Sequence, residues 1–518
     1  MPDLYQELCK LADSDMYPFH MPGHKRNLES TPMKGAFRCD ITEIDDYDNL
    51  HDASGIILEA EKRANRLYGS EETFFLVNGS TCGVLSAISA AAGEGDTVLA
   101  ARGSHKSFYH AVYMRNLKIK YLPYKLDQNY GIPTGYTAKE IEDNLEAGIK
   151  CVFITSPTYE GKCSEIREIA KVCHSRGIPL IVDAAHGAHF VLNNRADKKV
   201  LDDSMVTQDT ASAIDYTNNL YDDIPESAVA QGADLVIHSV HKTLPSMTQT
   251  ALLHVQGNLV DRNRLKRFLR IYQSSSPSYV LMSSIDLCVK EITDNGKSFV
   301  NRLLQLRNKI QTATHNCRYI IVPGKNAIED AAKVLIYVNI GTMTGQDLYD
   351  ILRKEYHLQL EMAGDRYALA IISGWDTDNG VDRLIRAILE IDNKLQQSIG
   401  TLEDSHNNSS DEHNGVSSSE KIYELPDAFM SIRNAWDADS EVVELQEAEG
   451  RVSAEFINLY PPGIPLIAPG EIFNRAIIDE VCHYLDNCMN VQGIVCIGDN
   501  DMESQDIIRK GVLCVKQK

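Results

Sequence analysis

The sequence lacks the long apolar runs that membrane-spanning helices require, since no stretch approaches about 18 consecutive apolar residues. Its first residues, MPDLYQELCKLADSD, lack the basic region followed by an apolar run that marks a signal peptide. The 12 cysteines form neither a CxxC pair nor a dense framework, and this usage fits a reducing compartment. We therefore predict a cytoplasmic protein with no membrane partner.

An excess of positive charge is also missing. The chain carries 51 lysine and arginine residues against 73 aspartate and glutamate residues, which gives a formal net charge of −22. This balance disfavours nucleic acid and anionic membranes as the main partner, whereas an acidic field attracts cationic ligands. The 43% hydrophobic content is enough for large buried cores, and 518 residues correspond to about three domains.

Two polar segments interrupt the chain. Residues 401–420 (TLEDSHNNSSDEHNGVSSSE) have almost no apolar side chains, so we predict a flexible linker there. Residues 194–226 are also rich in polar and acidic side chains and are predicted to form an insertion or a long surface loop. The predicted organisation is an N-terminal segment at 1–54, a large domain at 55–285, a small domain at 286–400, the linker at 401–420 and a C-terminal domain at 421–518.

Between about residues 56 and 255 the sequence alternates between strand-like and helix-like segments. Ile57, Ala60, Ala64 and Leu67 recur at helical spacing, and Gly69 follows as a C-terminal cap. Such alternation predicts an α/β fold with a mainly parallel sheet, in which ligands bind beyond the carboxyl ends of the strands. The predicted strands are 73–77, 97–100, 118–122, 151–155, 179–182, 233–237 and 250–255.

Polar segments follow the first two of these strands. NGSTCG at 78–83 opens an alanine-rich helix, where Ser80, Thr81 and free backbone N–H groups could bind a phosphate; a plain helix cap is the alternative. His105, in GSHKS, could stack on a flat ring or could lie in a solvated loop. SPTYEG at 156–161, after a later strand, is a polar turn of ambiguous meaning.

Charged residues follow two further strands. Asp183, after PLIV, could cap a turn or could bind a buried cation such as a protonated pyridine nitrogen. Lys242, in HSVHKTL, could be a lysine that reaches the surface or a desolvated nucleophile for a carbonyl group. His186 and His189 raise the question of a metal, but no His-x3-His pattern or third ligand is evident nearby, so no metal is predicted.

One cofactor uses all four of these features. Pyridoxal phosphate needs a phosphate cradle, a side chain that stacks on its ring, an acid for its pyridine nitrogen and a lysine for its aldehyde. The four occur in order along the chain, each at a strand end, and the set is far more specific than any member. We therefore predict a pyridoxal-phosphate enzyme in which Lys242 holds the cofactor as a Schiff base.

Further segments carry a family resemblance. They are FHMPGHK at 19–25, DITEI at 40–44, DNLH at 48–51, SSSPSY at 274–279, YPPGIP at 460–465 and PGE at 469–471. Together with the motifs above, they make the chain resemble the fold-type-I pyridoxal-phosphate-dependent ornithine/lysine/arginine decarboxylases over nearly its whole length. The resemblance is to the shorter type, which lacks an amino-terminal receiver-like domain.

The resemblance implies a large α/β domain of the pyridoxal-phosphate-dependent transferase type (aminotransferase fold type I), a smaller α+β domain and a C-terminal α+β domain. It implies that Lys242 forms the Schiff base, that Asp183 keeps the pyridine nitrogen protonated and that His105 stacks on the ring. His186 would lie near the cofactor's phenolic oxygen. Members are at least dimers with active sites at the interface. The residues implied to hold phosphate are Ser80, Thr81, Ser239 and His241, with Ser275 and Ser276 reaching a neighbour's cofactor.

The implied activity is the decarboxylation of arginine, lysine or ornithine to an amine and carbon dioxide, as in polyamine biosynthesis. The distal cation of such a substrate needs a carboxylate, for which Glu471 and Glu43 are candidates; the sequence does not choose among the three amino acids. Two alternatives stay open. One is an aminotransferase or another lyase on the same fold, for which Arg366 could anchor the α-carboxylate. The other is a catalytically idle homologue with a regulatory role.

Overall fold

The computed structural model describes residues 3–29, 31–193, 223–324, 328–403, 420–460, 463–497 and 509–517. Most of the predicted linker at 401–420 and of the predicted insertion at 194–226 lies outside these ranges. In the described part of the chain, no helix is long and apolar enough to cross a membrane. All twelve cysteines are described, and all are free.

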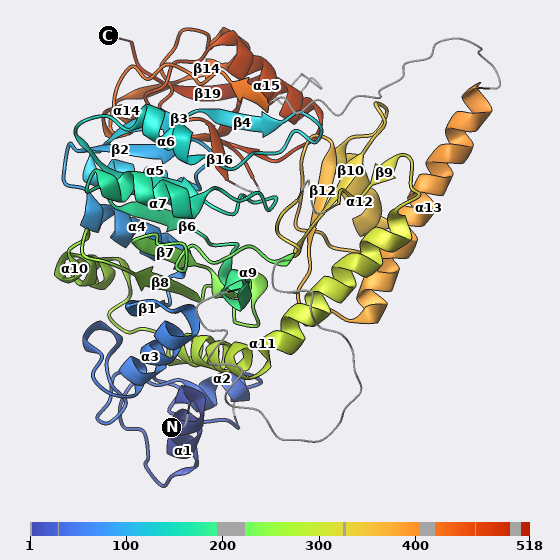
Figure 1. Ribbon diagram of the computed structural model, residues 1–518. Coiled ribbons are helices and arrows are strands. Elements are labelled where there is room, and N and C mark those ends of the chain that lie inside the picture. Colours follow the sequence, from blue (N-terminus) through green and yellow to red (C-terminus); the bar gives the residue numbers. More distant parts are fainter. Residues whose placement is uncertain are drawn as a thin grey trace, which may run out of the picture.

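A seven-stranded sheet forms the centre of the molecule (Figure 1). Its strand order is β3-β2-β5-β6-β7-β8-β1, and all neighbours from β3 to β7 pair in parallel. Only β8 runs antiparallel to its two neighbours. The predicted mainly parallel sheet is thereby confirmed. The strands are β1 Glu72–Leu76, β2 Thr97–Ala101, β3 Lys118–Leu122, β5 Ile149–Thr155, β6 Leu180–Asp183, β7 Leu235–His238 and β8 Ala251–Val255.

Helices cover both faces of this sheet, because its strands are apolar on both sides. Helices α4 (Gly79–Ala91), α5 (Lys106–Arg115) and α10 (Arg262–Tyr272) pack on one face. Helices α6 (Ala138–Asn144) and α7 (Ile166–Ser175) pack on the other.

The helix predicted before the first strand is α3, Ile56–Tyr68. Ile57, Ala60 and Ala64 are fully buried on one face of it, as their spacing indicates. Gly69 ends the helix with φ +68°, and its N–H donates to the carbonyl of Asn65. Glycine adopts this left-handed backbone without steric cost, so the predicted cap is confirmed.

A long helix joins the large sheet to a second, smaller one. Helix α11 spans Tyr279–Thr314, and its first part packs on α3 and on the N-terminal helices, whereas its second part packs in the small core. The N-terminal elements are α1 (Leu4–Asp13), α2 (Lys34–Cys39) and η1 (Leu50–Asp52). The small antiparallel sheet, in the order β11-β12-β10-β9, contains β9 Ile320–Ile321, β10 Lys333–Val338, β11 Met362–Ala363 and β12 Tyr367–Ile371, with helices α12 (Gly345–Lys354) and α13 (Asp378–Glu403).

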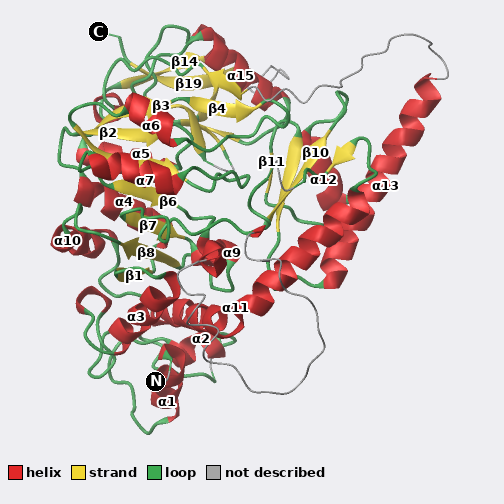
Figure 2. Cartoon of the chain, viewed as in Figure 1, coloured by secondary structure: helices red, strands yellow, loops and turns green. Residues whose placement is uncertain are grey.

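The remaining residues form a C-terminal unit of two three-stranded sheets with its own core (Figure 2). Strand β13 (Glu420–Tyr423) instead pairs with β4 (Tyr124–Asp127) of the large domain. The C-terminal elements are α14 Ile432–Trp436, β14 Ser440–Glu444, η5 Leu445–Glu447, β15 Ile457–Leu459, β16 Ile464–Ile467, α15 Arg475–Asp486, β17 Val491–Gln492, β18 Ile494–Ile497 and β19 Arg509–Val515.

A buried ion pair joins the C-terminal unit to the large domain. Arg102, directly after β2, donates Nη1–H to Glu471 Oε1 at 2.5 Å and Nη2–H to Oε2 at 2.9 Å. Arg102 is 2% exposed and Glu471 is 3% exposed. The backbone N–H of Ala468 also donates to Glu471. Because the pair is bidentate and buried away from water, removal of one partner leaves the charge of the other buried and uncompensated.

We expect Arg102→Met to destabilise the protein by about 3–5 kcal/mol, because it leaves the Glu471 carboxylate buried and unpaired. Chemical denaturation of the variant and the parent measures the difference. The same change at Arg475, whose pair with Asp479 is solvent-exposed, is the control and should cost less than about 1 kcal/mol. Equal losses in the two variants would contradict the structural role of Arg102.

Candidate active site

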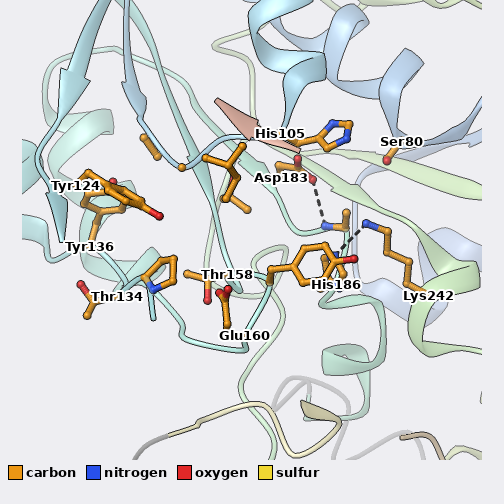
Figure 3. A pocket seen from close by; sticks show the side chains of 17 residues that line it. Ser80, His105, Tyr124, Thr134, Tyr136, Thr158, Glu160, Asp183, His186 and Lys242 are labelled. Atoms are coloured by element: carbon orange, nitrogen blue, oxygen red, sulfur yellow. Dashed lines mark hydrogen bonds between the residues drawn. The ribbon is translucent and has the colours of Figure 1, made fainter. Parts of the chain in front are cut away.

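The carboxyl ends of the parallel strands open onto a cavity (Figure 3). Each strand places the residues that follow it at this edge of the sheet, as parallel pairing requires. Ser80, His105, Asp183, His186 and Lys242 line the cavity. These are five of the residues that the sequence singled out, and they come from four connections of the large domain, because Asp183 and His186 both lie at the end of β6.

Lys242 and Asp183 lie at the base of this cavity. Lys242 belongs to the short helix α9 (Val240–Thr243), directly after β7, and burial lowers the pKa of its amine. Asp183 is the last residue of β6, and its Oδ1 accepts a hydrogen bond from the N–H of Ala185. Burial raises the pKa of Asp183, and the nearby charge of Lys242 opposes that rise. A buried acid therefore faces a buried amine.

His186 lies between two lysine amines. Its Nε2 is 3.0 Å from Nζ of Lys242, and its Nδ1 is 2.8 Å from Nζ of Lys333. Burial and the two neighbouring cations hold the pKa of His186 well below its usual range, so its imidazole is neutral. In a neutral imidazole one ring nitrogen donates and the other accepts, so one of the two lysine amines must be neutral to accept from the ring.

Lys333 reaches this position from the small domain. It begins β10 and is fully buried, and burial lowers its pKa to about 8. Its stem passes Gly161, where a side-chain carbon would lie 2.8 Å from Lys333 Cγ. Gly161 also has φ +101°, so glycine is required there for two reasons. The chain therefore allows this close approach of Lys333 to the large domain.

His105 forms another wall of the cavity. It is the N-cap of α5, and its Nδ1 accepts from the N–H of Ser107. Burial lowers the pKa of His105 to about 4, with smaller contributions from Lys242 and Lys106, so the ring is neutral. Figure 3 shows its imidazole above Asp183 and beside Ser80. This placement suits a ring that stacks on a flat ligand.

The start of α4 provides an anion site at the same edge. Gly79 opens the helix with φ +76°, and Asn78 provides no side-chain cap, so the first N–H groups remain available. Ser239 is fully buried, and its Oγ has no hydrogen-bond partner in the described part of the chain. A buried hydroxyl without a partner is costly unless a ligand satisfies it. With Lys242 and Asp183, these features fit pyridoxal phosphate.

The structure places other predicted residues outside the cavity lining. Thr81 lies on the exposed side of the first turn of α4, and His241 is bound through Nδ1 to the carbonyl of Thr250. Glu471 is paired with Arg102, as described above. Glu43 lies in the N-terminal segment, where its charge contributes to the raised pKa of Tyr279.

Ser275 and Ser276 are exposed and also lie outside the cavity lining. They are close to the start of α4, because the N–H of the preceding Ser274 donates to Asn78.

Sequence reasoning missed several residues of the site. Nothing in the sequence indicates that Lys333 belongs to the site, since a lysine at the start of an apolar run is typical of an exposed strand end. Tyr159 and Glu160 lie in SPTYEG, which follows β5 at the same sheet edge as the other motifs; that position was the available signal. Tyr124 and Tyr136 also line the cavity. No group of three or more potential metal ligands occurs among the described residues.

The fold is that of an α/β enzyme, and the residues gathered at the strand ends would fit pyridoxal phosphate. Comparison with known proteins specifies the family. The model of the Orn/Lys/Arg decarboxylase major domain matches residues 2–359, and that of the C-terminal domain of the same family matches residues 418–492. Because the first match covers more than half of the chain, the protein belongs to the Orn/Lys/Arg decarboxylase family.

Individual relatives agree with this assignment. An arginine decarboxylase of Bacillus subtilis is 28% identical over 95% of each chain, and one of Halalkalibacterium halodurans is 30% identical over 91% of each. The crystal structure of the Francisella novicida lysine decarboxylase LdcF superposes with a TM-score of 0.78 at 17% identity, covering 100% of this chain and 81% of that one. The predicted fold class and the predicted class of enzyme, an amino-acid decarboxylase, are confirmed.

We expect Lys333→Met to raise the pKa of Lys242, because the substitution removes a neighbouring cation. The neutral, nucleophilic fraction of Lys242 near pH 7 then falls, so cofactor capture slows by about tenfold. The measurement is the rate at which stripped enzyme regains pyridoxal-phosphate absorption, as a function of pH. Lys309→Met, at an exposed lysine of α11, is the control. An unchanged pH midpoint in Lys333→Met would refute the coupling.

Proposed function

We propose that the protein converts a basic amino acid and a proton into the corresponding amine and carbon dioxide, using pyridoxal phosphate. Arginine is the first candidate substrate, because the relatives from Bacillus subtilis and Halalkalibacterium halodurans are arginine decarboxylases; lysine and ornithine follow. The observation that carries the proposal is the buried amine of Lys242, which lies between Asp183 and His186 at the carboxyl ends of the strands of a chain of this family.

The cofactor would be held by residues of the large domain. Lys242 would bind its aldehyde, Ser80 and Ser239 would bind its phosphate together with the start of α4, and His105 would stack on its ring. When bound, pyridoxal phosphate supplies an aldehyde for the substrate amine and a ring that accepts the electron pair of the broken Cα–carboxylate bond.

The protein's own residues would control protons around that ring. Asp183, buried and facing a cation, would hold a proton at the pyridine nitrogen. His186 would hydrogen-bond the amine of Lys242, and burial lowers the pKa of that amine toward the neutral state that a carbonyl nucleophile needs. After the carboxylate leaves, Lys242 or His186 would deliver a proton to Cα, since both lie on the same wall of the cavity.

The position of Arg366 does not support the aminotransferase alternative. Arg366 lies outside the cavity lining, and its Nε–H and Nη2–H both donate to the carbonyl of Val338. Of the described residues that line the cavity, none is an arginine. The intact set of Lys242, Asp183 and the phosphate site also argues against an idle homologue.

We extend the proposal to assembly as a homo-oligomer with active sites near the interface. Ser275 and Ser276 are exposed beside the start of α4, where a neighbouring chain's cofactor could meet them. In the N-terminal segment, Phe19 is 90% exposed and Met21 is 67% exposed. Such exposure of large apolar side chains is unusual for a monomer.

The product distribution tests the reaction. We expect carbon dioxide and agmatine from arginine, or cadaverine or putrescine from lysine or ornithine, with no requirement for a keto-acid acceptor. Because each turnover consumes a proton, an unbuffered assay should become alkaline. Glutamate formation from 2-oxoglutarate, with no carbon dioxide from any of the three amino acids, would instead identify an aminotransferase.

Two substitutions test the residue roles. Lys242→Ala should abolish turnover and also the covalent fixation of cofactor by borohydride, because no other amine lines the cavity among the described residues.

Asp183→Ala should retain bound cofactor and lose about a hundredfold or more in rate, because the ring nitrogen loses its charged partner. Circular dichroism checks the fold of both. Normal turnover in either variant would remove that residue from the mechanism.

A further inference from the structure

Glu160 lies where two cavities meet. It follows β5 in the turn 156–161, and it lines both the active-site cavity and an adjoining cavity. Tyr124, Pro133 and Ile464 are the other residues that line both. Glu160 is only 3% exposed. A second buried carboxylate, besides Asp183, is therefore built into the wall of the site.

One oxygen of Glu160 has a partner and the other does not. Oε1 accepts a hydrogen bond from the hydroxyl of Tyr367 at 2.9 Å. Oε2 is buried and has no hydrogen-bond partner in the described ranges. Burial raises the pKa of Glu160, and the hydrogen bond from Tyr367 and, to a smaller extent, the charge of Lys333 oppose that rise. An orphaned carboxylate oxygen on a cavity wall is suited to a cationic ligand that donates to it.

The position of Glu160 matches the shape of an elongated amino acid. Figure 3 shows Lys242, His105 and Ser80 at one end of the cavity, Tyr124 and Tyr136 at the other, and Glu160 between them. A substrate whose α-amine is at Lys242 therefore extends its side chain past Glu160. The rings of Tyr124 and Tyr136, beyond Glu160, add a cation–π attraction for a guanidinium or ammonium group.

Other carboxylates are less suitable. Of the described residues that line the active-site cavity, only Glu160 and Asp183 are acidic, and Asp183 faces Lys242. Glu471 has both oxygens on Arg102. Glu43 lies outside the lining.

We propose that Glu160 is the specificity-determining residue that binds the distal cation of the substrate through Oε2. The inference rests on the proposed decarboxylation of a basic amino acid and adds to it the residue that selects for the positive charge. It also assigns Tyr367 a role: its hydroxyl occupies Oε1 and so leaves Oε2 as the acceptor for the ligand.

The test is Glu160→Gln in the holoenzyme, which removes the charge but keeps the volume and an acceptor for Tyr367. Binding of arginine, lysine and ornithine, and of the uncharged norleucine, is followed through the change in cofactor absorption. We expect the dissociation constant of the basic amino acid that the parent prefers to rise about 10- to 100-fold. Binding of norleucine should change less than about threefold. The variant thus loses selectivity for charge rather than affinity in general.

Glu61→Gln is the matched control. Glu61 is also buried, burial raises its pKa to about 8, and its Oε1 accepts from the N–H of Phe75, which a glutamine can replace. Because Glu61 lines neither of the two cavities, its substitution should leave the ratio of basic amino acid to norleucine unchanged. A similar loss of selectivity in both variants would mean that net charge, and not a contact with Glu160, causes it.

Glu160→Asp is the second variant, and it serves also if Glu160→Gln fails to retain cofactor. Aspartate keeps the charge, but its side chain is one methylene shorter. The preference among the basic amino acids should therefore shift toward the longer ones. Unchanged selectivity in the variants that retain cofactor would overturn the role of Glu160. If the parent releases no carbon dioxide from any substrate, the proposed function fails, but the binding ratios still decide whether Glu160 binds the cation.

Discussion

Two lysine amines on either side of one imidazole constrain the whole site. Lys242 and Lys333 both lie within 3.0 Å of His186, in a region from which water is largely excluded. Two cations at this separation repel strongly at low dielectric, so one amine must be neutral. Burial lowers the pKa of both amines, to about 8 for Lys333, so the neutral form of an amine becomes accessible nearer to neutral pH.

This arrangement requires the domains to dock closely. Lys333 comes from the first residue of β10 in the small domain, whereas His186 and Lys242 come from the large one. Gly161 allows the lysine stem to pass, and the N–H of Asp330 donates to the carbonyl of Gly161 across the same boundary. The C-terminal unit is fixed at the other side by the buried pair of Arg102 and Glu471. The contact between Lys333 and His186 therefore depends on packing between the small and the large domain.

The sequence predicted the large domain well because its signals are local. Each buried strand is a short apolar run, and the polar motif after it must lie at the common carboxyl edge, so Ser80, His105, Asp183 and Lys242 could be brought together without a structure. Lys333 could not be found in this way. Glu160 does follow a strand, β5, at the common edge, but the sequence does not show that one of its oxygens lacks a partner. Lys333 is buried only because a second domain covers it, and the function of Glu160 depends on an oxygen that a distant residue, Tyr367, leaves unpaired. Glu471 is the opposite case. Its motif, PGE, made it a candidate for binding the distal cation of the substrate, but its carboxylate is already bound by Arg102.

The distribution of charge in the cavity also bears on which bond breaks. His105 and His186 are neutral because burial lowers their pKa, burial also lowers the pKa of Lys242, and no arginine is present among the described residues of the lining. A substrate carboxylate near Lys242 thus meets few positive charges and little water. An aminotransferase stabilises this carboxylate with an arginine, which keeps it in place while the Cα–H bond breaks. Without such an anchor the charged carboxylate gains most by leaving as neutral carbon dioxide, because loss of charge is favoured in a poorly solvating site. The proposed contact of Glu160 with the distal cation would then orient the substrate from the other end of the cavity.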